Sequence, residues 1–188
     1  MRVIDNFISN EEATTIKNYI LENEVRVKNL GPDIYTGTSD DSLTGRYKVY
    51  NWLTSKTVGS ILKPKLSKLF SNMYIQLWAN IFRKGEGIRE HRHNKNHGYN
   101  RIISGNLFIY GPDNSATGYE KIGLQKNKVG TLMTFGVDVV HWVEPNISDT
   151  PRISMAFDVH PTNEFFDSTY SFVKLTYHLV GGRIAKLV

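Results

Sequence analysis

The hydrophobic pattern of the chain changes near Asn72, and this change limits the folds that the chain can adopt. Before that point, apolar residues recur with helical spacing in two segments, one starting after Ser9 and one running from Ser55 to about Asn72. Beyond it, short β-rich runs separated by turn sequences cover residues 73 to 83, 102 to 110, 130 to 135, 139 to 143 and 152 to 160. Two helices followed by many short strands predict a mainly β fold, an antiparallel barrel or sandwich with the helices packed on one face.

The first predicted helix has a clear start signal, and the second has an interruption. Ser9 and Glu12 match a capping box, in which each side chain can bond the backbone amide of the other residue. A helix should therefore start there, and its apolar stripe ends near Asn23. The second helix contains Pro64, which must kink it or split it because proline has no amide hydrogen.

The length of 188 residues fits a single domain with one core. We expect one domain over residues 1–188, in which a helical and loop-rich part (1–72) supports a β core (73–160), followed by a C-terminal extension (161–188). No apolar run approaches the roughly 20 residues that span a bilayer, and the acidic N-terminus lacks the features of a signal peptide. We therefore expect a cytoplasmic protein with no membrane partner.

The chain contains no cysteine. This absence excludes a disulfide framework, a thiol nucleophile, an iron–sulfur cluster and every cysteine-ligated zinc site. A bound metal must therefore use histidine, carboxylate or carbonyl ligands. The formal net charge of +5 is mild, and by itself it does not separate a protein with a polyanionic partner from an ordinary soluble one.

Histidines gather in one part of the sequence, where three of the six lie within seven residues. Alternate residues of a strand point to the same face, so His91 and His93 can direct two imidazoles toward one point while Arg92 faces away. A third ligand must come from elsewhere, and His141 lies in a β-rich, otherwise apolar run that an antiparallel barrel could place alongside. The remaining histidines are interpreted as a spare ligand or a solvated loop residue (His97) and as ordinary core or surface residues (His160 and His178).

Arg152 and Ser154 form a second candidate feature. They lie two residues apart on a predicted strand and so share a face, and a short turn joins this strand to that of His141. A guanidinium fork beside a hydroxyl suits the bidentate binding of a carboxylate. Apolar neighbours favour burial of Arg152, and a buried arginine without a partner is costly. The pair therefore indicates an anionic ligand.

On these residues the chain resembles the 2-oxoglutarate and Fe(II)-dependent oxygenase superfamily, whose members carry a His-x-Asp/Glu motif, a distal His and then an Arg. The corresponding residues here are His91-Arg92-His93, His141 and Arg152-Ile153-Ser154. The opening from Val3 to Glu12 is similar to the lead-in helix of prolyl-hydroxylase-like members. The run from Ser104 to Phe108 resembles the strand after the metal motif in small bacterial and phage members. The likeness covers most of the chain and is strongest in the β core.

The resemblance implies a double-stranded β-helix, a jelly-roll or cupin-like barrel, with the N-terminal helices packed on one sheet. It also implies a dioxygenase that uses Fe(II) and 2-oxoglutarate, with ascorbate as a candidate reductant. In such enzymes the oxidative decarboxylation of 2-oxoglutarate to succinate and carbon dioxide is coupled to hydroxylation of a substrate C–H bond.

The resemblance also assigns the site residues. They are the metal ligands His91, His93 and His141, the carboxylate-binding pair Arg152 and Ser154, and two candidate cosubstrate or substrate contacts, Asn106 and Asn80, for which a strand-end or surface amide is the alternative. The sequence departs from the superfamily pattern at His93, which occupies the usual carboxylate position. We hypothesise three-histidine ligation, which carries one negative charge less and favours a more Lewis-acidic iron. If His93 does not bind, two protein ligands remain, and water or another anion fills the gap.

The substrate is less well specified. The prolyl-hydroxylase-like members make a residue of a peptide or protein the first expectation, with a small metabolite as the alternative. The loop-rich segment from Gly31 to Gly45 is interpreted as a lid over such a substrate. Residues 83 to 101 carry six basic and two acidic side chains, and this local excess would favour entry of dianionic 2-oxoglutarate. The expected setting is the cytoplasm of a bacterium or of a phage-infected host cell.

Two other function classes fit parts of the sequence. A cupin-type dioxygenase or isomerase would use the pattern Gly85-x5-His91-x-His93, but the glutamate that should follow is absent, as is the Pro-x-Gly before the second motif's histidine. The Arg152-x-Ser154 pair also argues against a cupin, which needs no buried carboxylate-binding arginine there. A basic nucleic-acid-binding module is the other alternative, and the chain has no helix-turn-helix, RNP or zinc-knuckle signature.

Overall fold

The structure, a computed structural model, describes residues 1–28, 51–93 and 103–161 and the short strands within 173–184. Its helices are α1 (Asn10–Lys28), the 3₁₀ helix η1 (Trp52–Thr54) and α3 (Lys56–Leu69). Its strands are β1 (Arg2–Ile4), β2 (Tyr74–Phe82), β3 (Ile88–His91), β4 (Ile103–Tyr110), β5 (Ala116–Tyr119), β6 (Gly123–Lys126), β7 (Leu132–Gly136), β8 (His141–Val143), β9 (Arg152–His160), β10 (Val173–Lys174), β11 (Leu179–Val180) and β12 (Arg183–Ile184). The expected lid (31–45), His97 and His178 lie outside the described residues.

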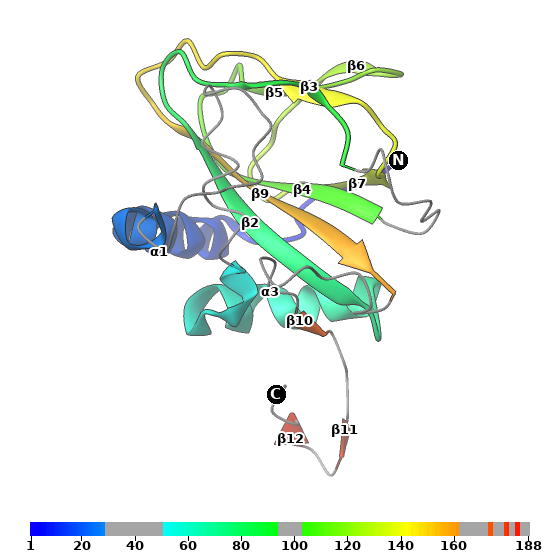
Figure 1. The fold of residues 1–188 in the computed structure, drawn as a ribbon. Coiled ribbons are helices and arrows are strands. Elements are labelled where there is room, and N and C mark those ends of the chain that lie inside the picture. Colours follow the sequence, from blue (N-terminus) through cyan, green and yellow to red (C-terminus); the bar gives the residue numbers. More distant parts are fainter. Residues whose placement is uncertain (29–50, 94–102, 162–172, 175–178, 181–182, 185–188) are drawn as a thin grey trace.

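The strands form a larger and a smaller antiparallel sheet. The larger sheet has the order β1-β7-β4-β9-β2-β10, and the smaller one has the order β3-β8-β5-β6, while β11 pairs with β12. Figure 1 shows the smaller sheet lying over one face of the larger sheet, with α1 and α3 against the other face. The prediction of a mainly β fold with helices on one side of an antiparallel sheet is confirmed.

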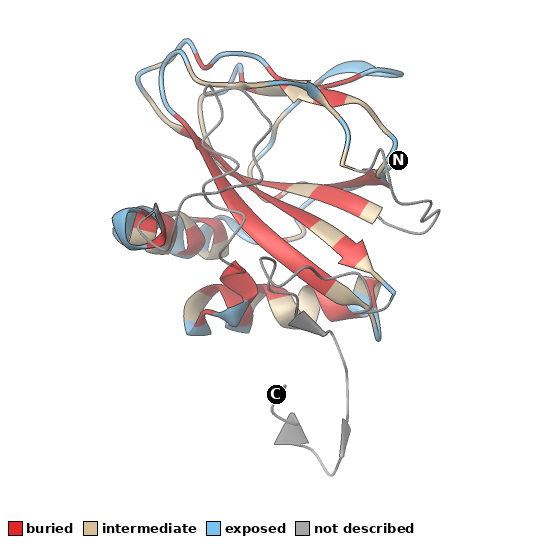
Figure 2. Ribbon diagram, in the orientation of Figure 1, coloured by how far each residue is buried: buried red, intermediate tan, exposed pale blue. Residues whose placement is uncertain are grey.

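The two faces of the larger sheet differ in chemistry, as β9 shows. Its odd-numbered residues, including Met155 and Phe157, join the apolar core shared with α1 and α3. On the other face Arg152, Ser154 and Ala156 are also buried, but they line a pocket between the two sheets. Figure 2 shows that the central strands are buried along most of their length, as a sheet covered on both faces must be. The core therefore lies below the sheet and the polar site above it.

The capping box predicted for the first helix is present. The amide of Ser9 donates to Oε2 of Glu12 (2.8 Å), and the amide of Glu12 donates to Oγ of Ser9 (3.1 Å). The helix runs to Lys28, beyond the predicted end near Asn23. Tertiary contact explains the extension, because Glu24 accepts two hydrogen bonds from the guanidinium of Arg83 (2.9 and 2.7 Å) just after β2.

The second helix, α3, also begins where the sequence predicts. The hydroxyl of Ser55 accepts from the amide of Val58 (3.1 Å), which caps the first turn. Pro64 lies inside α3 without splitting it. The chain then turns at Asn72, whose φ of 61° lies in the left-handed region that asparagine tolerates better than most residues. The residue at which the hydrophobic pattern changes is thus the turn from helix into β2.

All five predicted strands are present, with bounds shifted by a few residues. One detail was wrong: β3 ends at His91, so His93 lies just past the strand and not on it. The reason is the length of the partner strand, because β8 begins at His141, the residue opposite His91. Beyond that pair, the amide of His93 donates to the carbonyl of Val137 (3.1 Å).

The described helices include none that is long and apolar enough to span a membrane. The division into 1–72, 73–160 and 161–188 stays a prediction.

Asn51 connects the helical part to the larger sheet. Its side chain is buried, and its amide nitrogen donates to the carbonyl of Ile75 in β2 (2.9 Å). Its oxygen accepts from the amides of Leu77 in β2 and Leu53 in η1, each at 3.2 Å. One side chain therefore satisfies three buried backbone groups on two elements.

Replacing Asn51 by alanine should lower the free energy of unfolding by about 2–3 kcal/mol, because buried backbone groups of β2 and η1 lose their partners. Urea denaturation measures this change. Ser60→Ala, which removes an exposed hydrogen bond within α3, is the control and should stay within about 0.5 kcal/mol of wild type. An Asn51→Ala variant as stable as the control would contradict this role.

Candidate metal centre and anion pocket

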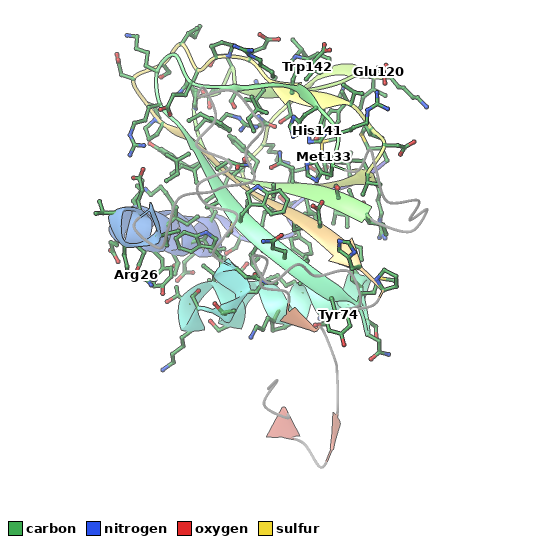
Figure 3. All side chains as sticks on the ribbon, in the orientation of Figure 1. Arg26, Tyr74, Glu120, Met133, His141 and Trp142 are labelled. Carbon is green, nitrogen blue, oxygen red and sulfur yellow. The ribbon has the colours of Figure 1, made fainter. Side chains whose placement is uncertain are left out.

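Three histidines converge between the two sheets. In the pairing of β3 with β8, His91 lies directly opposite His141. Between ring centroids, His91 lies 4.2 Å from His141 and 5.4 Å from His93. The rings of His93 and His141 are 5.0 Å apart. One ligand atom from each residue lies within 4.8 Å of the others. Figure 3 shows His141 in the space between the sheets. The arrangement can hold one metal ion.

Hydrogen bonds fix which nitrogen of each ring can bind that ion. Each Nδ1 lies against an oxygen acceptor: the carbonyl of Arg89 for His91 (2.9 Å), the carbonyl of Val139 for His141 (3.0 Å) and Oδ1 of Asp158 for His93 (2.6 Å). Because carbonyl and carboxylate oxygens accept, each Nδ1 must carry the hydrogen. This leaves Nε2 of all three rings as the ligand atom.

The electrostatics of the cluster favour the form that binds metal. Burial, with repulsion from His91 and His93, lowers the pKa of His141 to about 3. Its imidazole is therefore neutral at pH 7, as a metal ligand must be. Aromatic rings enclose the cluster: that of Phe135 lies 4.8 Å from the ring of His141, and that of Trp78 lies 5.6 Å from the ring of His93.

Arg152 is a buried cation in the same pocket, with 2% of its surface exposed. Its guanidinium donates to the hydroxyls of Ser115 (3.0 Å) and Thr117 (2.9 Å), and more weakly to that of Ser154 (3.4 Å). No carboxylate pairs with it among the residues that the structure describes. Burial lowers the pKa of Arg152 to about 10, so it stays charged at pH 7. A buried charge held only by neutral groups is costly, and an anionic ligand would compensate it.

Two further polar groups in this region have no hydrogen-bond partner within the described part of the chain: Oδ1 of Asn80 and the hydroxyl of Tyr119. Asn80 lines the pocket, and the ring of Tyr119 stacks beside that of His141. Burial raises the pKa of Tyr119, and the nearby charge of Arg152 opposes this rise only in part. Its hydroxyl therefore remains a neutral donor at pH 7. Such groups fit a polar ligand that supplies the missing partners.

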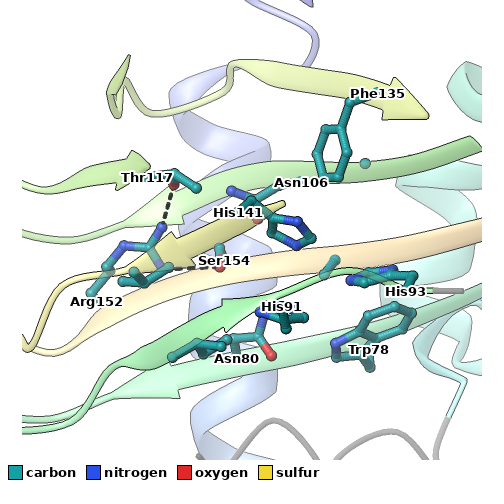
Figure 4. A pocket seen from close by; sticks show the side chains of 14 residues that line it. Trp78, Asn80, His91, His93, Asn106, Thr117, Phe135, His141, Arg152 and Ser154 are labelled. Atoms are coloured by element: carbon teal, nitrogen blue, oxygen red, sulfur yellow. Dashed lines mark hydrogen bonds between the residues drawn. The ribbon is translucent and has the colours of Figure 1, made fainter. Parts of the chain in front are cut away.

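The pocket brings together every predicted site residue. Its walls include the metal-ligand candidates His91, His93 and His141, the pair Arg152 and Ser154, and the amides Asn80 and Asn106. Figure 4 shows Arg152 at one end of the pocket and the three histidines toward the other. A ligand that binds a metal at one end and carries an anion at the other matches this arrangement.

Sequence reasoning missed several polar residues that complete the site. Ser115 and Thr117, which hold Arg152, flank the start of the four-residue strand β5, whose composition gave no strand signal. Asp158 had a readable signal, since it continues the alternation of Arg152 and Ser154 along one face of β9. His160 is the last residue of β9 and is not one of the three clustered histidines.

The local basic excess is partly neutralised. Arg83 pairs with Glu24 on α1, and Lys84 pairs with Asp149 (3.0 Å). Arg89 and Arg92 are exposed. The attraction of an anionic cosubstrate by this segment stays a prediction.

Comparison with known proteins gives a fold but no close relative. No family model and no curated protein matches the sequence. A prolyl hydroxylase of Trichoplax adhaerens, solved with a peptide fragment of the hypoxia inducible factor oxygen degradation domain, aligns with a TM-score of 0.62 at 12% identity over 85% of this chain and 83% of that one. The viral collagen prolyl hydroxylase of Paramecium bursaria Chlorella virus-1 aligns at 0.58 and 12% over 85% and 88%. A Pseudomonas putida prolyl-4-hydroxylase aligns at 0.52 and 13% over 86% and 92%.

These structures are similar along nearly their whole length, although the sequences have diverged widely. The resemblance to the oxygenases that a few sequence motifs indicated is therefore confirmed at the level of the fold: the chain folds like the prolyl hydroxylases.

Proposed function

We propose that this protein is an Fe(II)- and 2-oxoglutarate-dependent dioxygenase. One observation carries the proposal: a single pocket holds three converging imidazoles and a buried arginine that lacks a carboxylate partner among the described residues. A 2-oxo acid with a distal carboxylate has the two ends that such a pocket requires. The similarity to prolyl hydroxylase structures supports the same function through the fold.

In this proposal the two facing sheets are the sheets of a double-stranded β-helix. The cupin alternative would use a similar barrel and the same histidines, but it gives no role to Arg152. Three hydroxyls hold that guanidinium in place, where it can bind a carboxylate. This arrangement favours the oxygenase over the cupin. A basic nucleic-acid-binding module gives no role to a buried arginine, so it has less support.

The proposal gives the pocket residues separate roles in binding the metal and the cosubstrate. His91, His93 and His141 would hold Fe(II), a metal that imidazole ligands suit. A bound Fe(II) would supply the redox chemistry by which the decarboxylation of 2-oxoglutarate is coupled to hydroxylation of a substrate C–H bond. Arg152 would hold the distal carboxylate of the cosubstrate with help from Ser154.

The remaining walls of the pocket would orient the reactants. Asn80 and Asn106 present amides to the cosubstrate or substrate, and the rings of Trp78 and Phe135 exclude water from the metal's surroundings. Ascorbate would serve as a reductant that keeps the iron in the ferrous state.

For the substrate we propose a residue of a peptide or protein, with proline as the first choice. The structural neighbours are prolyl hydroxylases, and one of them was solved with a peptide. A small metabolite is the alternative substrate class. Succinate release that depends on an added proline-rich peptide would separate the two.

Replacing Arg152 by alanine should weaken 2-oxoglutarate binding at least about 30-fold, because one partner of a buried charge pair is lost. Anaerobic titration of the Fe(II) protein with 2-oxoglutarate measures this through the weak visible charge-transfer band. Arg92→Ala, which removes an exposed positive charge near the same pocket, is the matched control and should bind almost as well as wild type. Absence of the band in wild type, or equal affinity in Arg152→Ala, would overturn the proposal.

Replacing His93 by alanine should reduce bound iron well below one ion per chain, because two imidazoles hold Fe(II) less tightly than three. Metal analysis after anaerobic loading and desalting gives the stoichiometry. His160→Ala removes a histidine outside the cluster and should leave the stoichiometry unchanged. Unchanged iron content in His93→Ala would contradict three-histidine ligation.

A further inference from the structure

The contact between His93 and Asp158 distinguishes this histidine from the other two. Nδ1 of His91 and of His141 each face a neutral backbone carbonyl, whereas Nδ1 of His93 faces a carboxylate oxygen of Asp158 at 2.6 Å. Both side chains are largely enclosed, with 7% of the His93 side chain and 21% of the Asp158 side chain exposed. The contact is therefore shielded from water, and a charge there acts strongly on its neighbours.

Ser104 holds the carboxylate in place. Its hydroxyl donates to the same oxygen of Asp158 (2.6 Å) and lies 3.0 Å from Nδ1 of His93. The backbone sets this geometry, because Ser104 and Asp158 are direct partners in the pairing of β4 with β9. Side chains of direct partners on one face lie within reach of each other. The larger sheet thus supports His93, which lies past the end of β3 and has no strand of its own.

The negative charge of the Asp158 carboxylate matters at this site because of the ligands around it. The three imidazoles are neutral ligands, so within the part of the chain that the structure describes no negatively charged ligand offsets a divalent ion. A carboxylate that accepts from Nδ1 makes Nε2 a stronger electron donor and fixes the ring toward the metal. It would also place a negative charge beside the His93 ring, on the side opposite the ion.

From this geometry we infer that Asp158, held by Ser104, is a positioning residue that supplies through His93 the negative charge missing from the three-histidine ligand set. The inference rests on the proposed function only in requiring that the three histidines bind a divalent metal. It adds Asp158 and Ser104 to the site. A carboxylate–histidine–metal triad would then take the place of a directly bound carboxylate.

The test is anaerobic titration of the full-length apo protein with Co(II), followed by its visible absorption. Asp158→Ala removes the charge and the hydrogen bond, and it should weaken Co(II) binding about 10- to 100-fold. Asp158→Asn keeps an oxygen that can accept from Nδ1 and removes only the charge, so its affinity should fall between those of wild type and Asp158→Ala. Ser104→Ala keeps the carboxylate and should show the smallest loss.

Controls separate this role from a structural one. Asp149→Asn removes an exposed carboxylate bonded to Lys84 and should bind Co(II) as wild type does. In Asp158→Asn the Co(II) absorption bands should shift in position or intensity, a change that altered folding of the apo protein would not produce. Melting of each apo protein, followed by circular dichroism, identifies any variant that is not folded.

The outcomes distinguish the two proposals. If wild type binds Co(II) and Asp158→Asn and Asp158→Ala bind it equally well with the same spectrum, the positioning role is overturned and the metal site stands. If His141→Ala and wild type alike fail to bind Co(II), the metal site itself is absent and both proposals are overturned. A loss of Co(II) affinity that is largest in Asp158→Ala, smaller in Asp158→Asn and smallest in Ser104→Ala supports the positioning role of Asp158.

Discussion

The site depends on the antiparallel pairing of β3 with β8. This pairing sets His91 opposite His141, and a shift by one residue would turn one of the two imidazoles to the other face of the sheet. Two glycines allow the close approach that the smaller sheet needs. A Cβ at Gly87 would lie 2.5 Å from the carbonyl of Val143, and one at Gly118 would lie 2.0 Å from the ring of Trp142. The sheet can form in this register because these positions carry no side chain.

β9 joins the site to the core of the protein. One face of this strand packs with the helices, and the other carries Arg152, Ser154 and Asp158, so the site rests on a strand whose position the core determines. Neutral hydroxyls and the rings of Phe82 and Phe108 surround the guanidinium. A protein carboxylate in their place would neutralise Arg152 and fill the position that a ligand's carboxylate needs. The lack of such a partner in the described residues is therefore what the proposed carboxylate-binding role requires.

The parts of the fold that depend on local signals were predictable from the sequence. The capping box at Ser9 predicted a helix start, and the β-rich run from 152 to 160 predicted a strand. The spacing of His91 and His93 indicated two imidazoles directed toward one point. What could not be predicted depends on distant contacts. β5 is a strand because it pairs with β8 and β6, and the end of β3 at His91 follows from the length of β8. Asp158 was visible as a residue on the face of Arg152, but its contact with His93 exists only in three dimensions.

The most direct test of the central claim is a crystal structure of the protein grown without oxygen in the presence of Mn(II), as a stand-in for Fe(II), and 2-oxoglutarate. We predict one metal ion, located by anomalous scattering, bonded to Nε2 of His91, His93 and His141, with the distal carboxylate of 2-oxoglutarate hydrogen-bonded to the guanidinium of Arg152. A metal ion bound elsewhere, or a cosubstrate whose distal carboxylate does not reach Arg152, would contradict the account.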